Sequence, residues 1–371
     1  MQFTVDSSTL LHGLQKGARV SPTRSTMPIL NHILFTVKGN VLSMRSTDIE
    51  ITYTLNLNVL GEDEGAVALP VRLLQEITSE LPDTELTFAW SDDSRVTLST
   101  TAGTYKIVGR PALDFPDAPE LGPAQSLEIK SKVLKRTVEK TVFAVSKDEL
   151  KPALLGVLFE LKNNEIRAVA TDGHRLVKYT NRDFVSADFE ANIIVPPKFL
   201  SLIQSFLDDG DTINLSVGEK YISVATETAT IFSRLIDEQY PDYGSVIPST
   251  NDKTVTLSSK DLVTTVRRVS IFSNRTTHQV ALKLHPGYIE VFTEDPEAST
   301  SAKEQVLSDY DGEELTLGYN SIYLKDMLKN VETDRVVFRL GSEIGPGLIL
   351  PEVQAEKEEL VMLLMPIRLQ G

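Results

Sequence analysis

The sequence predicts an α+β protein built from three tandem copies of one domain, each with two helices packed on antiparallel sheets. One pattern carries this prediction: a short strand followed by apolar residues at helical spacing. It begins at Phe3–Val5, at Leu127–Ile129 and at Val255–Leu257, roughly 125 residues apart each time. Self-similarity at a fixed period is typical of architectures assembled from repeated units.

Later positions in the copies keep the same spacing. Thr47-Asp48, Thr171-Asp172 and Glu294-Asp295 each follow a run of alternating apolar and polar residues. Copies one and two also close on the same type of tripeptide, Phe115-Pro116-Asp117 and Tyr240-Pro241-Asp242. Because Pro, Gly and Ser residues follow these tripeptides, we expect domains at 1–123, 124–249 and 250–371.

Each copy is expected to begin with a strand and a first helix, and to continue with alternating strands, a second helix and further strands. In copy two, Val133, Leu134 and Val138 mark the apolar face of the first helix. The expected strands include Ile33–Val37, Val41–Thr54, Val157–Leu161, Ile166–Tyr179, Glu85–Trp90 and Thr104–Val108. The second helices are expected after Pro70, after Pro197 and near Asn320-Ser321.

Composition excludes several classes of protein. The chain of 371 residues has no cysteine, which rules out disulfides and thiolate metal sites and fits a reducing cytoplasm. Its first residues lack the pattern of a signal peptide, and the longest apolar run, Leu360–Ile367, is too short to span a bilayer. We expect a cytoplasmic protein with no metal, no cofactor and no membrane partner.

The charge of the chain is unevenly distributed. The net charge is −15, which by itself argues against a nucleic-acid partner. The six expected helical stretches nevertheless sum to +11 and leave −26 for the rest. Either each helix has a solvated basic face, or all six helices face one anionic partner. No zinc-finger spacing, RNP signature or long basic recognition helix accompanies this charge, so any DNA binding should ignore sequence and weaken with salt.

The run Thr171-Asp-Gly-His-Arg175 has three possible interpretations. Asp172 and His174 could belong to a catalytic or metal site, but no HExxH or nucleophile-elbow pattern is present. Asp172-Gly173 between two alternating runs is also a hairpin signal, and the acidic turn recurs in the other copies. His174 and Arg175 occur in copy two alone, which favours the rim of a binding pocket.

At these residues the chain resembles a known family. The matching segments are Pro28–Leu30, Thr47–Glu50, Ala170–Leu176, Tyr240–Tyr243, Gly318–Asn320 with Tyr323, and Met365–Leu369. They are similar, over the full length and in domain order, to the bacterial sliding clamp, the β subunit of DNA polymerase III. The resemblance implies a head-to-tail homodimer that closes into a ring around duplex DNA, lined by helices. It also implies binding of the polymerase III catalytic subunit, the clamp loader and other proteins with a clamp-binding motif.

The resemblance assigns residues to DNA and to the dimer interface. Arg24, Arg72 and Lys198 occupy family positions associated with DNA. The basic helices add Lys135, Arg136, Arg267 and Arg268 to the DNA-binding set. At the interface, Tyr105 and Ile107 of one subunit are expected to meet Ile271 and Phe272 of the other.

The resemblance also implies a pocket for short linear peptides of the Gln-Leu-x-Leu-Phe type. It would lie where the copy-two turn meets the last strand of the chain, whose Met-rich apolar end suits adaptable binding. Its residues would be Leu154, Thr171, Gly173, His174, Arg175, Leu176, Pro241, Val246, Asn320, Tyr323, Ile344, Pro346, Leu363, Met365, Pro366, Ile367 and Arg368. Two features depart from the pattern of the family: Ser245 stands where a basic residue is expected, and Gln370-Gly371 extends the terminus.

Three functions follow from these patterns. The leading one is a DNA sliding clamp that confers processivity and has no catalytic residues. The second is a peptide-binding scaffold that does not encircle DNA, against which the positive charge of the helices argues. The third is a hydrolase that uses Asp172 and His174, for which no nucleophile or metal constellation is present.

Overall fold

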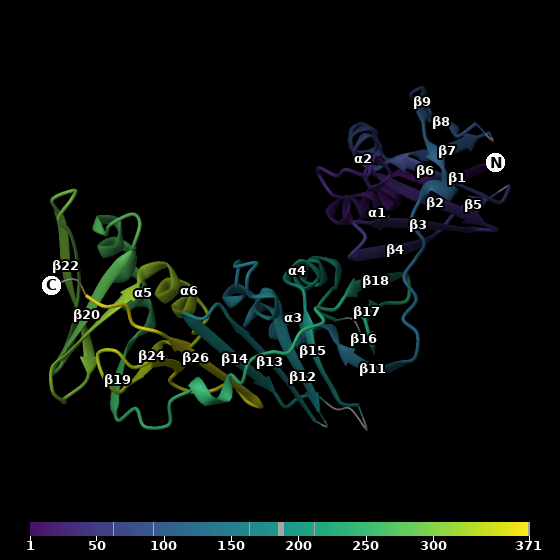
Figure 1. Cartoon of the computed structure of the whole chain (residues 1–371). Helices are drawn as coiled ribbons and strands as arrows, with labels where there is room; N and C mark the ends of the chain where they lie inside the picture. The colour runs from purple at the N-terminus through teal and green to yellow at the C-terminus, as the bar shows by residue number, and fades with distance from the viewer. Residues whose placement is uncertain (62, 92, 163, 185–188, 211, 370–371) are drawn as a thin grey trace. The chain divides into compact units, whose positions relative to one another are not determined.

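The computed structural model describes residues 1–61, 63–91, 93–162, 164–184, 189–210 and 212–369. Gln370 and Gly371, the expected extension of the terminus, lie outside these residues. The chain forms two compact units (Figure 1). The first unit comprises Met1–Lys132 with Lys198–Leu235, and the second comprises Val133–Pro197 with Ile236–Gly371.

The first unit contains two antiparallel sheets. The five-stranded sheet has the order β5-β1-β7-β8-β9, and the nine-stranded sheet has the order β10-β6-β2-β3-β4-β18-β17-β16-β11. The strands of the first sheet are β1 (Gln2–Asp6), β5 (Leu60–Gly61), β7 (Glu85–Trp90), β8 (Arg95–Ser99) and β9 (Thr104–Val108). The strands of the second are β2 (His32–Lys38), β3 (Val41–Thr47), β4 (Ile51–Asn58), β6 (Gly65–Pro70), β10 (Arg110–Pro111), β11 (Ala124–Lys130), β16 (Thr212–Gly218), β17 (Tyr221–Ala225) and β18 (Ala229–Arg234).

Helices α1 (Ser7–Val20) and α2 (Val71–Glu80) pack against each other and cover the sheets of copy one. Asp6 caps α1, because its carboxylate accepts a 2.9 Å hydrogen bond from the backbone N–H of Thr9. The rings of Phe3 and Phe88 stack with centroids 5.0 Å apart at the centre of this core. The unit also holds the 3-10 helices η1 (Pro28–Asn31) and η2 (Ala112–Asp114) and, from copy two, helix α4 (Pro197–Phe206).

The second unit contains one twelve-stranded sheet. Its order is β15-β12-β13-β14-β26-β25-β24-β19-β22-β21-β20-β23. The strands from copy two are β12 (Val157–Lys162), β13 (Glu165–Thr171), β14 (Arg175–Asn181) and β15 (Ala191–Val195). Those from copy three are β19 (Lys253–Ser258), β20 (Gln279–His285), β21 (Tyr288–Asp295), β22 (Thr300–Asp309), β23 (Leu315–Asn320), β24 (Arg335–Leu340), β25 (Gly347–Pro351) and β26 (Glu358–Leu364).

Helices α5 (Ser259–Val269) and α6 (Ser321–Lys329) pack together on one face of this sheet, as Figure 1 shows. Ser258 caps α5, and Asn320 caps α6 by accepting from the backbone N–H groups of Ile322 and Tyr323. Helix α3 (Ser131–Glu139) belongs mainly to this unit. Its 3-10 helices are η3 (Val142–Ala144), η4 (Pro152–Leu155), η5 (Gly244–Val246) and η6 (Ser270–Phe272).

The copies are joined by antiparallel pairing of strands from neighbouring copies. Strand β4 of copy one pairs with β18 of copy two, and β14 of copy two pairs with β26 of copy three. Each junction thus turns two separate sheets into one continuous sheet and pairs edges that would otherwise be exposed.

The α+β prediction agrees with these elements, and the described residues contain helices at all six expected places. The runs Val41–Thr54 and Ile166–Tyr179 each divide into two strands, because the acidic turns at Asp48 and Asp172 reverse the chain. None of the helices in the described ranges has both the length and the apolar character needed to cross a membrane.

Candidate peptide-binding site and DNA-facing cations

The turn between β13 and β14 is held by its own polar side chains. The Thr171 hydroxyl donates to the Arg175 carbonyl at 2.6 Å and accepts from the Gly173 N–H at 3.1 Å. The Asp172 carboxylate accepts from the N–H groups of His174 and Arg175 at 2.9 and 3.0 Å. Gly173 has φ +90°, a conformation that glycine adopts readily.

Arg175 is buried behind this turn. Its guanidinium pairs with Asp172 at 3.1 Å and with Asp326 of α6 at 3.0 Å, and it donates to the Phe143 carbonyl at 2.8 Å. It also lies over the Tyr323 ring, 4.5 Å from the centroid. All three guanidinium nitrogens are therefore engaged, and Arg175 supports the turn from inside.

The exposed face of the turn is formed by His174. Its ring stacks near that of Tyr323, with centroids 6.2 Å apart. Burial raises the pKa of the Tyr323 hydroxyl, and the nearby Asp172 carboxylate raises it further. The His174 carbonyl accepts a 2.8 Å hydrogen bond from the backbone N–H of Met365, which ties the turn to the end of the chain.

The chain end continues along this surface. The Ile367 N–H donates to the Gly318 carbonyl at 2.8 Å, so the terminal segment is anchored to β23. A Cβ at Gly318 would lie 2.6 Å from the Ile367 carbonyl oxygen, which requires glycine at this position. The side chain of Met365 is 36% exposed.

An apolar cluster lies beneath the turn and the last strand. Its buried members are Leu158, Val169, Leu176, Ile194, Leu348 and Leu363, and half-buried residues such as Tyr240, Tyr243 and Ile247 pack against it. Leu176 and Leu363 are directly opposite each other in the β14–β26 pair. Val246, beside Ile247, is 51% exposed.

The other residues predicted for this pocket differ in exposure. Leu154 is buried, Pro346, Pro366 and Ile367 are half-buried, and Pro241, Ile344 and Arg368 are exposed. Asn320 is half-buried, and its side-chain oxygen already caps α6. Ser245, which stands where a basic residue was expected, is exposed and donates to the Asp242 carbonyl at 2.9 Å.

The geometry of the turn does not support catalysis. The Asp172 carboxylate is engaged by two backbone N–H groups and by Arg175, and it meets His174 only through the backbone. No group of three or more His, Cys, Asp or Glu side chains within the described residues could hold a metal ion. The arrangement is suited to binding.

Three of the predicted DNA-binding cations lie in or next to the helices of the first unit. Arg72 of α2 and Arg19 of α1 line a hollow of about 410 Å³ with Gln15, Ala18 and Gln75. Arg24 is exposed in the segment that follows α1. Lys198, near the start of α4, pairs with the Asp48 carboxylate and keeps half of its side chain exposed. Arg19 was absent from the predicted set, although it is one of the three basic residues in the first-helix region 9–24, which has no acidic residue.

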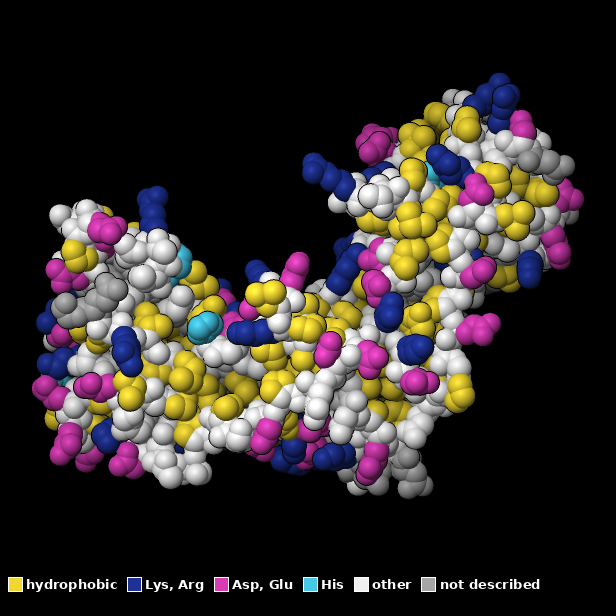
Figure 2. All heavy atoms as spheres, viewed as in Figure 1, with side chains coloured by type: hydrophobic (Ala, Val, Ile, Leu, Met, Phe, Trp, Pro, Cys, Tyr) yellow, Lys and Arg dark blue, Asp and Glu magenta, His cyan; other side chains and the backbone are white. Residues whose placement is uncertain are grey.

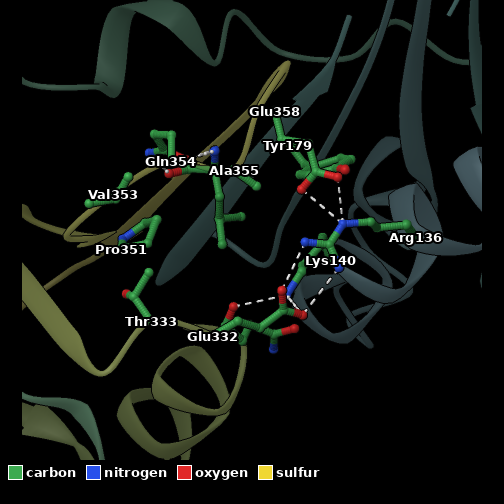
Figure 3. A pocket seen from close by; sticks show the side chains of 12 residues that line it. Arg136, Lys140, Tyr179, Glu332, Thr333, Pro351, Val353, Gln354, Ala355 and Glu358 are labelled. Carbon is green, nitrogen blue, oxygen red and sulfur yellow. Dashed lines mark hydrogen bonds and ion pairs between the residues drawn. The ribbon is translucent and has the colours of Figure 1, made fainter. Parts of the chain in front are cut away.

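Arg136 of α3 forms ion pairs with two glutamates. Its Nε lies 2.6 Å from one Glu358 oxygen, and its Nη2 lies 2.8 Å from Glu332 (Figure 3). Buried Lys140 pairs with the same Glu332 at 2.6 Å and donates to the Asn330 carbonyl. These side chains line one end of a cavity of about 240 Å³. Arg136 therefore pairs with two carboxylates of copy three, and its predicted contact with DNA stays a prediction.

The remaining predicted cations lie on α3 and α5. Lys135 is half-buried and Arg267 is exposed. Arg268 forms a two-pronged ion pair with Glu304 of β22, with nitrogen–oxygen distances of 2.9 and 2.5 Å. Figure 2 shows Lys and Arg side chains interspersed with Asp and Glu over the visible face of the molecule.

The residues predicted at the dimer interface fall into two groups. Ile271 and Phe272 of η6 are exposed, at 76% and 44%. Tyr105 is half-buried against the core of copy one, and Ile107 is only 5% exposed within that core. The alternation of β9 turns Ile107 inward against the core of copy one, and its predicted contact with the other subunit stays a prediction.

Three family models match successive parts of the chain. Profiles of the DNA polymerase III beta subunit match its N-terminal domain at residues 1–119, its central domain at 128–242 and its C-terminal domain at 244–368. The beta sliding clamp of Pseudomonas putida is 30% identical over 371 residues, with full coverage of both chains. That of Caulobacter vibrioides is 30% identical over 375 residues, with 99% of this chain and all of the relative covered.

Solved structures show the same likeness. The DNA polymerase sliding clamp from Pseudomonas aeruginosa, crystallised with a ligand, has a TM-score of 0.94 at 28% identity and full coverage of both chains. A sliding clamp from the same organism bound to griselimycin has a TM-score of 0.93 at 28% identity and full coverage of both chains. The sliding clamp from Bacillus subtilis has a TM-score of 0.94 at 26% identity, again over the whole of both chains.

Proposed function

This chain belongs to the DNA polymerase III beta subunit family, the bacterial sliding clamps, and we propose that two copies close head to tail into a ring around duplex DNA. Its role is that of a processivity factor in DNA replication, and it works by binding, without catalysis. Such a ring tethers the polymerase III catalytic subunit, the clamp loader and other factors that carry a short binding motif. We place this work in the cytoplasm.

One observation supports the ring most directly. Each junction inside the chain uses the same two structural positions: the fourth strand of one copy and the last strand of the next, as in β4–β18 and β14–β26. The third set of these positions forms no such junction among the described residues. Strand β9, the last long strand of copy one, pairs only with β8, and Thr300–Leu307 of β22 pair only with β21 in the described structure.

A second copy of the chain can fill this third junction. Head-to-tail pairing of β22 from one subunit with β9 from the next repeats the internal junction, and two such contacts close a ring. The exposed Ile271 and Phe272 lie next to β22, because the Phe272 carbonyl accepts from the Thr300 hydroxyl at 3.2 Å. Association would bury this apolar pair beside the half-buried Tyr105.

The cations on the helices provide the contact with DNA. The predicted cations that remain wholly or partly exposed include Arg24, Arg72, Lys198 and Arg267, and Arg19 joins them. The sequence has no base-reading motif. Binding through phosphates alone lets a ring slide along DNA of any sequence. We therefore propose that these side chains, with Lys135, line the hole, and that Arg136 serves the junction between copies two and three.

The peptide site is proposed at the turn of copy two. Exposed His174 is hydrogen-bonded through its carbonyl to Met365, and its ring lies near that of half-buried Tyr323. The apolar cluster that contains Leu176 and Leu363 lies on the two strands next to these residues. An extended peptide could bury Leu and Phe side chains there while its polar end meets backbone groups at the rim. Griselimycin is bound in one of the similar clamps, which is consistent with a clamp surface that accepts a ligand.

Retention on DNA tests the ring against a scaffold that does not encircle DNA. After loading, the clamp should stay on circular DNA and should be lost from a linear molecule of the same sequence by sliding off its ends. Blocking both ends of the linear DNA with bulky proteins should restore retention. Equal loss from circular and linear DNA would favour the scaffold.

A further inference from the structure

The peptide-site turn of copy two has a structural counterpart in copy one. The Thr47 hydroxyl donates to the Ile51 carbonyl at 2.9 Å and accepts from the Ile49 N–H at 3.0 Å. The Asp48 carboxylate accepts from the Ile51 N–H at 2.7 Å. Ile49, in the position of Gly173, has φ +83°. The two turns therefore share one hydrogen-bonding scheme and one backbone conformation.

The strand that follows each turn is joined to the next copy in the same way. The Arg234 N–H donates to the Glu50 carbonyl at 2.9 Å, as the Met365 N–H does to His174 at 2.8 Å. Arg234 thus corresponds to Met365, and Glu50 corresponds to His174. By this correspondence, the junction of copies one and two has its own version of the peptide-site surface.

The strand registers identify the residues of this second surface. Leu34, Arg45 and Thr54 are neighbours across β2, β3 and β4. They correspond to Leu158, Val169 and Lys178 across β12, β13 and β14. At the junction itself, Thr52 of β4 pairs with Phe232 of β18. This pair corresponds to Leu176 of β14 and Leu363 of β26 in the copy-two site. The apolar floor of the copy-two site is therefore replaced by a floor that contains an arginine.

The guanidinium of Arg45 has no hydrogen-bonding or ionic partner within the described chain, and its Nε is buried. It lies 5.7 Å from the centroid of the Phe115 ring, on a small apolar cluster with Leu30 and Leu34. Asp117 acts on it only at longer range. The two terminal nitrogens of Arg45 are not among the buried atoms, so a carboxylate from solution could bind the guanidinium there and form charge-assisted hydrogen bonds.

We propose that this surface, between β3 and β18 of the first unit, binds an extended peptide that presents a carboxylate to Arg45 and an apolar side chain to Phe232. A peptide fits better than a small anion because the surface extends over three paired strands and includes the half-buried Phe232 and, in the turn before β4, the exposed Ile49. Arg234, paired only loosely with Glu50 at 3.8 Å, is free to guide acidic residues at its margin. The proposal uses the analogy with the copy-two site, but its test reads the two surfaces separately.

Methyl-resolved NMR of the full-length clamp can test it. The probe is the peptide acetyl-Glu-Leu-Asp-Leu-Phe-amide, with acetyl-Gln-Leu-Asn-Leu-Phe-amide as its neutral counterpart. Leu34 and Ile49 methyl groups report on the second surface, and those of Leu176 and Leu363 report on the copy-two site. The acidic peptide should shift Leu34 and Ile49, and the neutral peptide should require at least about ten-fold higher concentration for the same shift.

Arg45→Met removes the charge while keeping the length of the side chain. It should abolish the shifts at Leu34 and Ile49 and leave those at Leu176 and Leu363 unchanged. Equal shifts in parent and variant, or no shift at Leu34 and Ile49 at millimolar peptide, would overturn the proposal. Saturation of the same signals by inorganic phosphate at lower concentration than the acidic peptide would also overturn it, in favour of a small-anion site.

Discussion

Arg175 Nη1 lies 3.0 Å from Asp326 Oδ2, and this ion pair joins the turn before β14 to helix α6. The same helix is capped by Asn320 and carries Tyr323, whose ring lies against the Arg175 guanidinium. The rim of the proposed peptide site is therefore assembled from copies two and three around one buried cation. Its geometry depends on residues that a bound peptide need not touch.

Arg175→Ala should weaken peptide binding through loss of this support. The change leaves Asp172 and Asp326 without their shared cation, and breaking a buried pair typically costs about 3–5 kcal/mol in the free energy of unfolding. Urea unfolding and calorimetry with a Gln-Leu-x-Leu-Phe peptide measure the two effects. The matched variant His174→Ala removes an exposed ring and should reduce affinity with little loss of stability. Loss of affinity in Arg175→Ala at unchanged stability would instead make Arg175 a direct peptide contact.

Replacing Ile271 and Phe272 together with Ala should convert the dimer into monomers. Both side chains are exposed in the single chain, and truncation of large apolar residues buried by association commonly costs about 2–5 kcal/mol each. Light scattering across a dilution series measures the shift in dissociation constant. Val353→Ala, at an exposed apolar residue outside β9 and β22, is the control and should leave the dimer intact. A double variant that remains dimeric at the lowest concentration would contradict the proposed pairing.

Arg19→Glu with Arg72→Glu should weaken DNA binding and reduce the slope of log affinity against log salt. Each lost phosphate contact lowers that slope by roughly one. The effect should be the same for DNA of any sequence, because these cations are not arranged to read bases. Lys220→Glu, in the β16–β17 hairpin and outside the helices, serves as the control. An unchanged salt slope in the double variant would remove the α1–α2 hollow from the DNA-facing surface.

The repeat pattern predicted the strands and helices well because burial alternates with period two or follows helical spacing. Leu10, Leu14, Leu262 and Val266, at matching points of copies one and three, are all fully buried. Side-chain partners were less predictable. Arg136 looked like one more cation on a basic helix, but its carboxylates come from residues about two hundred positions later. Ile107 matched an interface position, yet strand alternation places it inside its own domain. The partner of an ion pair and the face of a strand that is buried depend on segments far apart in the chain. The local spacing of residues does not identify those segments.

The ion pairs of Glu332 with Arg136 and Lys140 should make the free energy of unfolding depend on pH. Hydrogen bonds from Arg136 lower the pKa of Glu332 to about 2, and those from Lys140 contribute to the same shift. Burial acts in the opposite direction but is outweighed. Ionised Glu332 therefore stabilises the folded chain. This contribution is fully present above pH 4.5, the ordinary pKa of the group, and is lost as the pH falls through about 2. Because the side chain is about half exposed, the contribution should be roughly 1 kcal/mol or less.

Glu332→Gln should therefore lower the free energy of unfolding at pH 7 and have little effect near pH 2. Urea unfolding from pH 7 to pH 2 measures this difference. Glu343→Gln, at an exposed glutamate without an ion pair among the described residues, is the control. A constant difference between parent and Glu332→Gln at all pH values would mean that the variant acts through packing and not through charge.

Both equivalent turns are expected to favour glycine at the position with positive φ. Ile49 holds φ +83° with a β-branched side chain, a conformation that costs roughly 1–2 kcal/mol. Ile49→Gly should relieve this strain and, after the entropy of glycine is subtracted, raise stability by up to about 1 kcal/mol. Gly173→Ala should lower it by about 1–2 kcal/mol through the backbone alone, because a Cβ there would meet only Lys151 Nζ at 3.7 Å. Thermal and urea unfolding of both variants measure these changes. Destabilisation by Ile49→Gly would show that the half-exposed Ile49 side chain makes contacts worth more than its backbone strain.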